Sequence, residues 1–182
     1  MMGNFIGTYS GHHIDYARFS EDDVRIEDIA RALSMICRFG GHVPRHYSVA
    51  EHSLLVAELA PEGQKLEALL HDAAEAYVSD IVSPLKRMLP DYQLVEQRIE
   101  KAICRKFHIG KMSKEIHMAD MKALYVEARS FYGKEEVALW GLGKDIMNWG
   151  EYSSRDVLCF APSPQHIEKQ FMNAFLAYGG VK

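Results

Sequence analysis

Three segments of the chain carry histidines and carboxylates that could act together. The stretch HDAAEAYVSD places His71 beside Asp72 and adds Glu75 three residues later, directly after an apolar run. His52 and Asp120 each lie among apolar neighbours, in VAEHSLLVAELA and HMADMKAL. Residues i and i+4 of a helix share a face, so His71 and Glu75 are expected to point the same way. Asp72 would then lie about 100° round the helix from His71.

A bound metal ion would account for these residue types. The candidate ligands offer two nitrogens and at least two carboxylate oxygens, from His52, His71, Asp72 and Asp120. That mixture suits Mn, Fe, Co or Zn better than Ca. A divalent cation acidifies water that it binds, and Glu75 could accept and return the proton. The alternative is that the residues are unrelated, with the histidines on surfaces or in the core and Asp120 paired with Lys122 or Arg129.

The ordered set resembles the HD-domain metal-dependent phosphohydrolases. Similar motifs mark one prokaryotic and phage subgroup, and here they stand as TYSG, IEDIARALS, SMICRFGGH, YSVAEHS, HDAAEAYVSDIVSPLK and ADMKALYVEAR. The resemblance covers roughly residues 7–130 and is loose in the C-terminal third. The subgroup is similar to bacterial 5′-deoxynucleotidases and to phage dATP triphosphohydrolases.

The resemblance assigns expected roles. The metal ligands would be His52, His71, Asp72 and Asp120. Catalysis would fall to Glu75 as acid and base, with Asp72 helping to manage the protons. The expected substrate contacts are Arg38, Asp80 and Lys86, together with Ile14, Asp15 and Tyr16, which occupy the place where many relatives carry an aromatic FWP against the base. That departure leaves the base selectivity open.

Two further histidines, one in an expected loop and one on an expected helix, have alternative interpretations. His46 could contact phosphate as a protonated imidazole, or it could be an ordinary loop histidine. His117, three residues before Asp120, could serve a second metal, although the rest of a dinuclear ligand set is not visible.

The resemblance implies hydrolysis of the 5′-phosphate ester of a nucleotide. The first expectation is a deoxyadenosine nucleotide, with dATP giving deoxyadenosine and triphosphate or phosphates. The alternatives are a broad 5′-deoxynucleotidase acting on dNMPs, a phosphodiesterase, and a non-catalytic nucleotide-binding regulator. The expected cofactor is a divalent transition metal, Co, Mn or Zn, with Mg as a candidate second ion. Relatives often assemble, so a closed homo-oligomer is expected.

Composition limits the class of protein. The chain has 182 residues, of which 48% are apolar, and a net charge of -4. That size predicts one domain over residues 1–182, and that charge argues against a general binder of nucleic-acid polymers. We expect no signal peptide, and no apolar run approaches the ~18 residues of a membrane span. The cysteines (Cys37, Cys104 and Cys159) form no zinc pattern, which favours reduced thiols in a cytosolic protein. The family resemblance implies a bacterial or phage-infected host cytoplasm.

Periodicity predicts an all-α fold with a small β-hairpin in residues 1–20. Ser48 and Glu51 form a candidate capping box for a helix that ends near Leu59. Ser113 is a candidate cap for a later helix that Gly133 is expected to end. Further helices are expected from about residue 26, over 62–78, 92–109 and 113–133, and over 162–180 at the end, with 79–91 as a loop. Residues 134–164 show no clear pattern.

Overall fold

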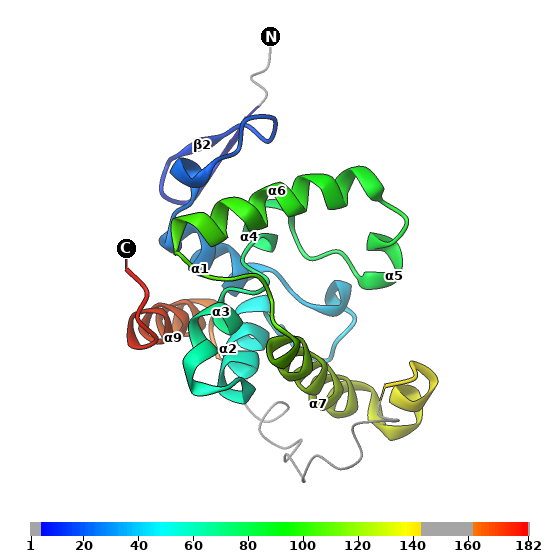
Figure 1. Ribbon diagram of the computed structural model, residues 1–182. Helices are drawn as coiled ribbons and strands as arrows, with labels where there is room; N and C mark the ends of the chain where they lie inside the picture. The colour runs from blue at the N-terminus through cyan, green and yellow to red at the C-terminus, as the bar shows by residue number, and fades with distance from the viewer. Residues whose placement is uncertain (1–4, 143–161, 182) are drawn as a thin grey trace.

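The structure, a computed structural model, describes residues 5–142 and 162–181. This part of the chain is mostly helical, with a two-stranded antiparallel sheet near the N-terminus (Figure 1). Strand β1 (Ile6–Gly7) pairs with β2 (His13–Ile14) so that Ile6 faces Ile14. The predicted all-α fold with an N-terminal hairpin is therefore confirmed.

The helices follow in order along the chain, with short 3-10 turns at Glu21–Asp23, Phe39–Gly41 and Glu62–Gln64. They are α1 (Ile26–Met35), α2 (Val49–Leu59), α3 (Lys65–Leu69), α4 (Glu75–Val78), α5 (Ser83–Lys86), α6 (Pro90–Lys106), α7 (Lys114–Leu139) and α9 (Pro164–Ala177). None of these described helices has the length and apolar character that a membrane crossing requires.

The core forms where α1 and α2 pack with α3 and α9. Its largest side chains are fully buried and include Ile29, Leu33, Leu69, Phe171 and Phe175. Helix α7 packs against α2, whereas α6 contacts α4 and α5 (Figure 1). The segments that carry the predicted ligands therefore converge on α2.

Two predicted helix caps are confirmed. The Ser48 hydroxyl accepts a hydrogen bond from the Glu51 amide, and the Glu51 carboxylate accepts one from the Ser48 amide, at 2.8 Å. Ser113 caps α7 by accepting from the Ile116 amide. The predicted end at Gly133 is a kink instead, with a φ of 85°, after which α7 continues to Leu139.

The prediction of a single helix over residues 62–78 is wrong. The chain leaves the α-helix after α3, and residues 70–74 form tight turns in which the Ala73 amide bonds to the Leu70 carbonyl and the Glu75 amide to the Asp72 carbonyl, both at 3.0 Å. The His71 ring competes with the helix, because its Nδ1 lies 2.8 Å from the Ala68 carbonyl oxygen. Residues three apart eclipse in such turns. Asp72 and Glu75, rather than His71 and Glu75, are thus expected to share a face.

Other predictions about the chain have mixed outcomes. The predicted loop 79–91 contains α5, a four-residue helix with a proline in its first turn. Cys37 and Cys104 are free thiols, while Cys159 lies outside the described residues. Most of the segment without a clear pattern, 134–164, also lies outside them.

Gly180 offers a test of the packing after α9. A Cβ atom at this position would lie 2.5 Å from the ring of Phe175, which is fully buried. We expect Gly180→Ala to lower the free energy of unfolding by about 1–3 kcal/mol, the usual cost of overpacking, in urea denaturation. Gly110→Ala is the control, because nothing lies within 4 Å of its Cβ position. Equal stability of the two variants would contradict the packing described here.

Candidate metal centre

Three predicted ligands meet at one place. His52 comes from α2, and His71 and Asp72 come from the turns between α3 and α4. One ligand atom of each lies within 4.8 Å of the other two. Asp72 Oδ2 lies 3.1 Å from His71 Nε2 and 3.6 Å from His52 Nε2. These residues form a group that can hold a metal ion.

Asp120 on α7 approaches the same group. Its Oδ1 lies 3.2 Å from His52 Nε2 and 4.0 Å from His71 Nε2. The contact follows from the packing of α7 against α2. The residues expected to act as ligands therefore come together from three segments that lie far apart in the sequence.

Both histidines turn the same ring nitrogen toward this group. His71 Nδ1 lies 2.8 Å from the Ala68 carbonyl oxygen, and His52 Nδ1 lies 2.6 Å from Glu127 Oε1. A carbonyl and a carboxylate only accept, so Nδ1 donates in each ring. The Nε2 atoms are buried and make no hydrogen bond of suitable geometry among the described residues, although oxygens of Asp72 and Asp120 lie 3.1 and 3.2 Å from them. Metal-bound histidines typically have this arrangement.

The charge around the group also favours a cation. The candidate site gathers the carboxylates of Asp72, Glu75, Asp80, Asp120 and Glu127. Burial and Arg38 lower the pKa of His52, but the carboxylates of Glu127 and Asp120 outweigh them and raise it to about 9. Without a metal ion, the carboxylates therefore favour the protonated, positively charged form of the His52 ring. A divalent ion at the Nε2 atoms would supply that charge.

Glu127 is a buried carboxylate that the sequence analysis did not single out. Its oxygens accept from the His52 ring, from the Tyr47 hydroxyl at 2.9 Å and from Arg38 Nη2 at 3.1 Å. Burial raises its pKa, but Arg38 and His52 outweigh burial and lower it to about 2. A signal was available, because Glu127 lies seven residues after Asp120, two turns along the same face of α7.

Arg38 lies between Glu127 and the ligand group. Its backbone amide donates to the Tyr47 carbonyl, which fixes the residue beside the start of α2. Its Nη1 lies 3.8 Å from Asp72 Oδ2, and its buried Nε has no partner among the described residues. The carboxylates around it raise its pKa despite burial, so the guanidinium keeps its charge. The structure brings this predicted substrate contact into the site.

Glu75 begins α4 and is 5% exposed. Burial, together with the charges of Asp72 and Asp80, raises its pKa well above the usual range. The opposite holds for Asp72, where burial is outweighed by His71, His52 and Arg38, which hold its pKa well below that range. Two neighbouring carboxyl groups whose pKa values are shifted in opposite directions can take separate roles in acid–base chemistry.

Lys86 approaches Glu75 from α5. Its Nζ lies 3.8 Å from Glu75 Oε1 and donates to Glu96 Oε1 at 2.7 Å. The Tyr92 hydroxyl bonds to the Ser79 carbonyl at 2.9 Å and ties the loop after α4 to α6. Asp80, in that loop, is a close electrostatic neighbour of Arg38 and Asp72, and burial raises its pKa. Lys86 and Asp80 therefore lie beside the candidate ligand group, and their contact with a nucleotide stays a prediction.

The remaining predicted contacts lie elsewhere or have other partners. Ile14 is fully buried in the core, so its side chain packs and offers no surface to a ligand. The Asp15 carboxylate accepts from the Ala17 amide, and the Tyr16 hydroxyl donates to the Tyr77 carbonyl. His46 Nε2 lies 3.3 Å from the Met35 carbonyl oxygen in an exposed loop. Roles for Asp15, Tyr16 and His46 in substrate binding stay predictions.

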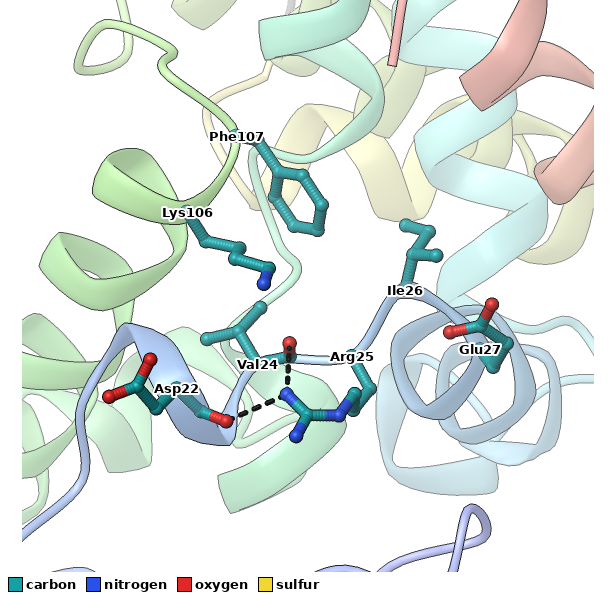
Figure 2. A pocket seen from close by; sticks show the side chains of 7 residues that line it. All are labelled: Asp22, Val24, Arg25, Ile26, Glu27, Lys106 and Phe107. Carbon is teal, nitrogen blue, oxygen red and sulfur yellow. Dashed lines mark hydrogen bonds between the residues drawn. The ribbon is translucent and has the colours of Figure 1, made fainter. Parts of the chain in front are cut away.

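A surface cavity of about 310 Å³ lies apart from the ligand group, between the start of α1 and the end of α6 (Figure 2). Its lining comprises Asp22, Val24, Arg25, Ile26, Glu27, Lys106 and Phe107. The Arg25 guanidinium donates to the backbone carbonyls of Asp22 and Val24. The lining mixes two cations with two carboxylates and includes none of the candidate ligands. The unpartnered buried atoms, rather than this hollow, therefore mark the candidate site.

Comparison with known proteins shows similarity over most of the chain. The chain is 44% identical over 173 residues to the uncharacterized protein YfdR of Escherichia coli, with 94% of each chain covered. It is 33% identical over 142 residues to an uncharacterized protein of Rhodobacter capsulatus, covering 70% of this chain and 72% of that protein. No protein-family model matches the chain.

Metal binding can be measured directly. We expect the wild-type chain to retain about one Mn²⁺ or Co²⁺ in equilibrium dialysis, and His71→Ala and Asp72→Ala each to weaken retention by at least ~10-fold. Each substitution removes a ligand atom from the group. His117→Ala is the matched control, since His117 is exposed on α7. Unchanged retention by both site variants would contradict the assignment, and a loss in the control would implicate His117.

Proposed function

We propose that the chain, which belongs to the family of YfdR, is a metal-dependent phosphohydrolase that cleaves the 5′-phosphate ester of a nucleotide. One observation carries the proposal. Five buried side-chain atoms make no hydrogen bond in the described chain, and four of them belong to the candidate site, namely His52 Nε2, His71 Nε2, Arg38 Nε and Glu75 Oε2; the fifth is Ser53 Oγ on α2. Buried polar groups are almost always hydrogen-bonded. Such a concentration of free atoms is expected to serve a ligand.

The free atoms divide into two chemical groups. The imidazole nitrogens, with Asp72 and Asp120, form a nitrogen and oxygen set suited to Co, Mn or Zn. When bound, such an ion supplies Lewis-acid charge and acidifies water. Arg38 and Lys86 are cations that can bind phosphate oxygens and offset charge that develops on phosphorus. The combination supports hydrolysis of a phosphate ester.

Glu75 is the proposed acid and base. Its Oε2 atom is buried and free of protein partners. A cation held by the ligand group would offset the charges of Asp72 and Asp80 that raise the pKa of Glu75, so the ionised carboxylate could then take a proton from the attacking water. As the water oxygen bonds to phosphorus, the bond from phosphorus to the 5′-oxygen breaks. Glu75 then returns the proton to that leaving oxygen. A regulator that only bound nucleotide would have no use for this carboxylate, whose burial costs free energy.

We propose a deoxyadenosine nucleotide as the substrate, with dATP first among them. Support comes from the resemblance of the chain's motifs to the HD-domain subgroup that includes dATP triphosphohydrolases. A broad 5′-deoxynucleotidase would use the same ligands and the same cations, and the difference would lie in how the base is bound.

A product assay tests the function. The purified chain with Mn²⁺ or Co²⁺ is given the four dNTPs, the four dNMPs and ATP, and nucleoside, phosphate and triphosphate are separated. We expect deoxyadenosine and triphosphate from dATP, and no product when EDTA is present. Phosphate released from all dNMPs would replace the specific substrate with a broad one. Bound nucleotide without any product would refute the hydrolase proposal.

Glu75→Gln tests the proton-transfer role. It removes the charge but keeps the shape, so metal retention and nucleotide binding should persist while kcat falls by ~10²–10⁴-fold. Glu115→Gln, at an exposed position of α7, is the matched control and should keep wild-type turnover. Near wild-type kcat in Glu75→Gln would remove Glu75 from the mechanism.

A further inference from the structure

We infer that Glu127 is a positioning residue for both halves of the candidate site, holding His52 toward the metal ligands and Arg38 toward the substrate phosphate. The inference rests on the proposed function and adds a residue that acts through two others. The two carboxylate oxygens of Glu127 are divided between the two groups.

Each oxygen of the carboxylate serves a different part of the site. Oε1 accepts from His52 Nδ1 at 2.6 Å and from the Tyr47 hydroxyl at 2.9 Å. Oε2 accepts from Arg38 Nη2 at 3.1 Å. Glu127 has no exposed surface, so water does not compete for these bonds. One side chain therefore fixes two functional groups at the same time.

The contact with His52 sets which ring nitrogen is free. A neutral imidazole carries one hydrogen, and if it sat on Nε2 the lone pair would point away from the ligand group. Glu127 only accepts, so it keeps the hydrogen on Nδ1. His71 is held in the same state by the Ala68 carbonyl. The acceptor of His52 is charged, which makes its Nε2 the more basic ligand atom.

The contact with Arg38 sets the direction of the guanidinium. The Arg38 side chain is 12% exposed, and a charge so deeply buried needs a counter-ion. Glu127 binds one terminal nitrogen, while the other lies 3.8 Å from Asp72. Nε is left without a protein partner. That free donor is then available for an oxygen of the phosphate.

Stability alone does not call for this arrangement. Buried ion pairs are often no more stabilising than apolar side chains of similar volume. Glu127 also lies on the same face of α7 as Asp120, two turns away. One stretch of α7, before its kink, therefore carries a proposed metal ligand and the group that orients another, which is a reason to retain a buried charge at this position.

The test compares Glu127→Gln with Tyr47→Phe. Both remove polar interactions around Glu127, but only the first removes the charge shared by His52 and Arg38. We measure Co²⁺ affinity by dialysis, the visible absorption of bound Co²⁺, and then kcat and KM for dATP at saturating metal. Glu127→Gln should weaken Co²⁺ binding by ~10–100-fold, change the Co²⁺ spectrum and raise KM several-fold. Tyr47→Phe should stay within about twofold of wild type.

A third variant separates the two halves. Arg38→Gln should raise KM and leave Co²⁺ affinity near that of wild type, because Arg38 does not contact the metal in this assignment. If circular dichroism shows that Glu127→Gln does not fold, Glu127→Asp takes its place. The shorter side chain keeps the charge but moves it away from both His52 and Arg38. The same direction of change is expected for metal affinity and KM.

The outcomes distinguish this inference from the proposed function. Wild-type Co²⁺ affinity, spectrum and KM in folded Glu127→Gln would overturn the inference while leaving the hydrolase intact. If the wild-type chain binds Co²⁺ but hydrolyses no nucleotide, the proposed function fails. Co²⁺ affinity and spectrum then decide whether Glu127 positions His52, with weakened binding in Glu127→Gln supporting that role and unchanged binding overturning it.

Discussion

Burying several carboxylates beside one another costs free energy unless positive charge lies within a few ångströms of each. Among the described residues of the candidate site, some carboxylates have a cation nearby and others do not. Arg38 offsets Glu127 and Asp72, and Lys86 offsets Glu96 and approaches Glu75. Positive charge is still short around the two imidazole Nε2 atoms. The same shortage explains the raised pKa of His52 and the proposed need for a divalent ion.

Local sequence signals predicted the scaffold well. The serine caps of α2 and α7 depend on a side chain and an amide three residues away, so a single sequence is enough to find them. The N-terminal hairpin and the amphipathic helices also have short-range patterns. The four candidate ligands were found because each carries a polar group in an apolar surrounding. Their convergence depends on the packing of α2 with α3 and α7, which the sequence does not encode locally.

The failures have specific physical causes. Apolar periodicity continues through residues 62–78. It does not indicate that the His71 ring forms a hydrogen bond with the Ala68 carbonyl in competition with the helical bond. Ile14 was assigned from its place in a family motif, although an isoleucine there is better suited to the core. Glu127 was missed because a lone glutamate on a long helix is usually solvated. Its three partners come from segments some 75–89 residues away.

The central claim is that His52, His71, Asp72 and Asp120 form one metal centre. Anomalous diffraction at the manganese edge, from crystals grown with Mn²⁺, tests it most directly. We expect one strong peak within coordination distance of both Nε2 atoms and of a carboxylate oxygen of Asp72, with Asp120 at or beside the ion. A site without a peak at saturating Mn²⁺, or a peak bound by other residues, would contradict it.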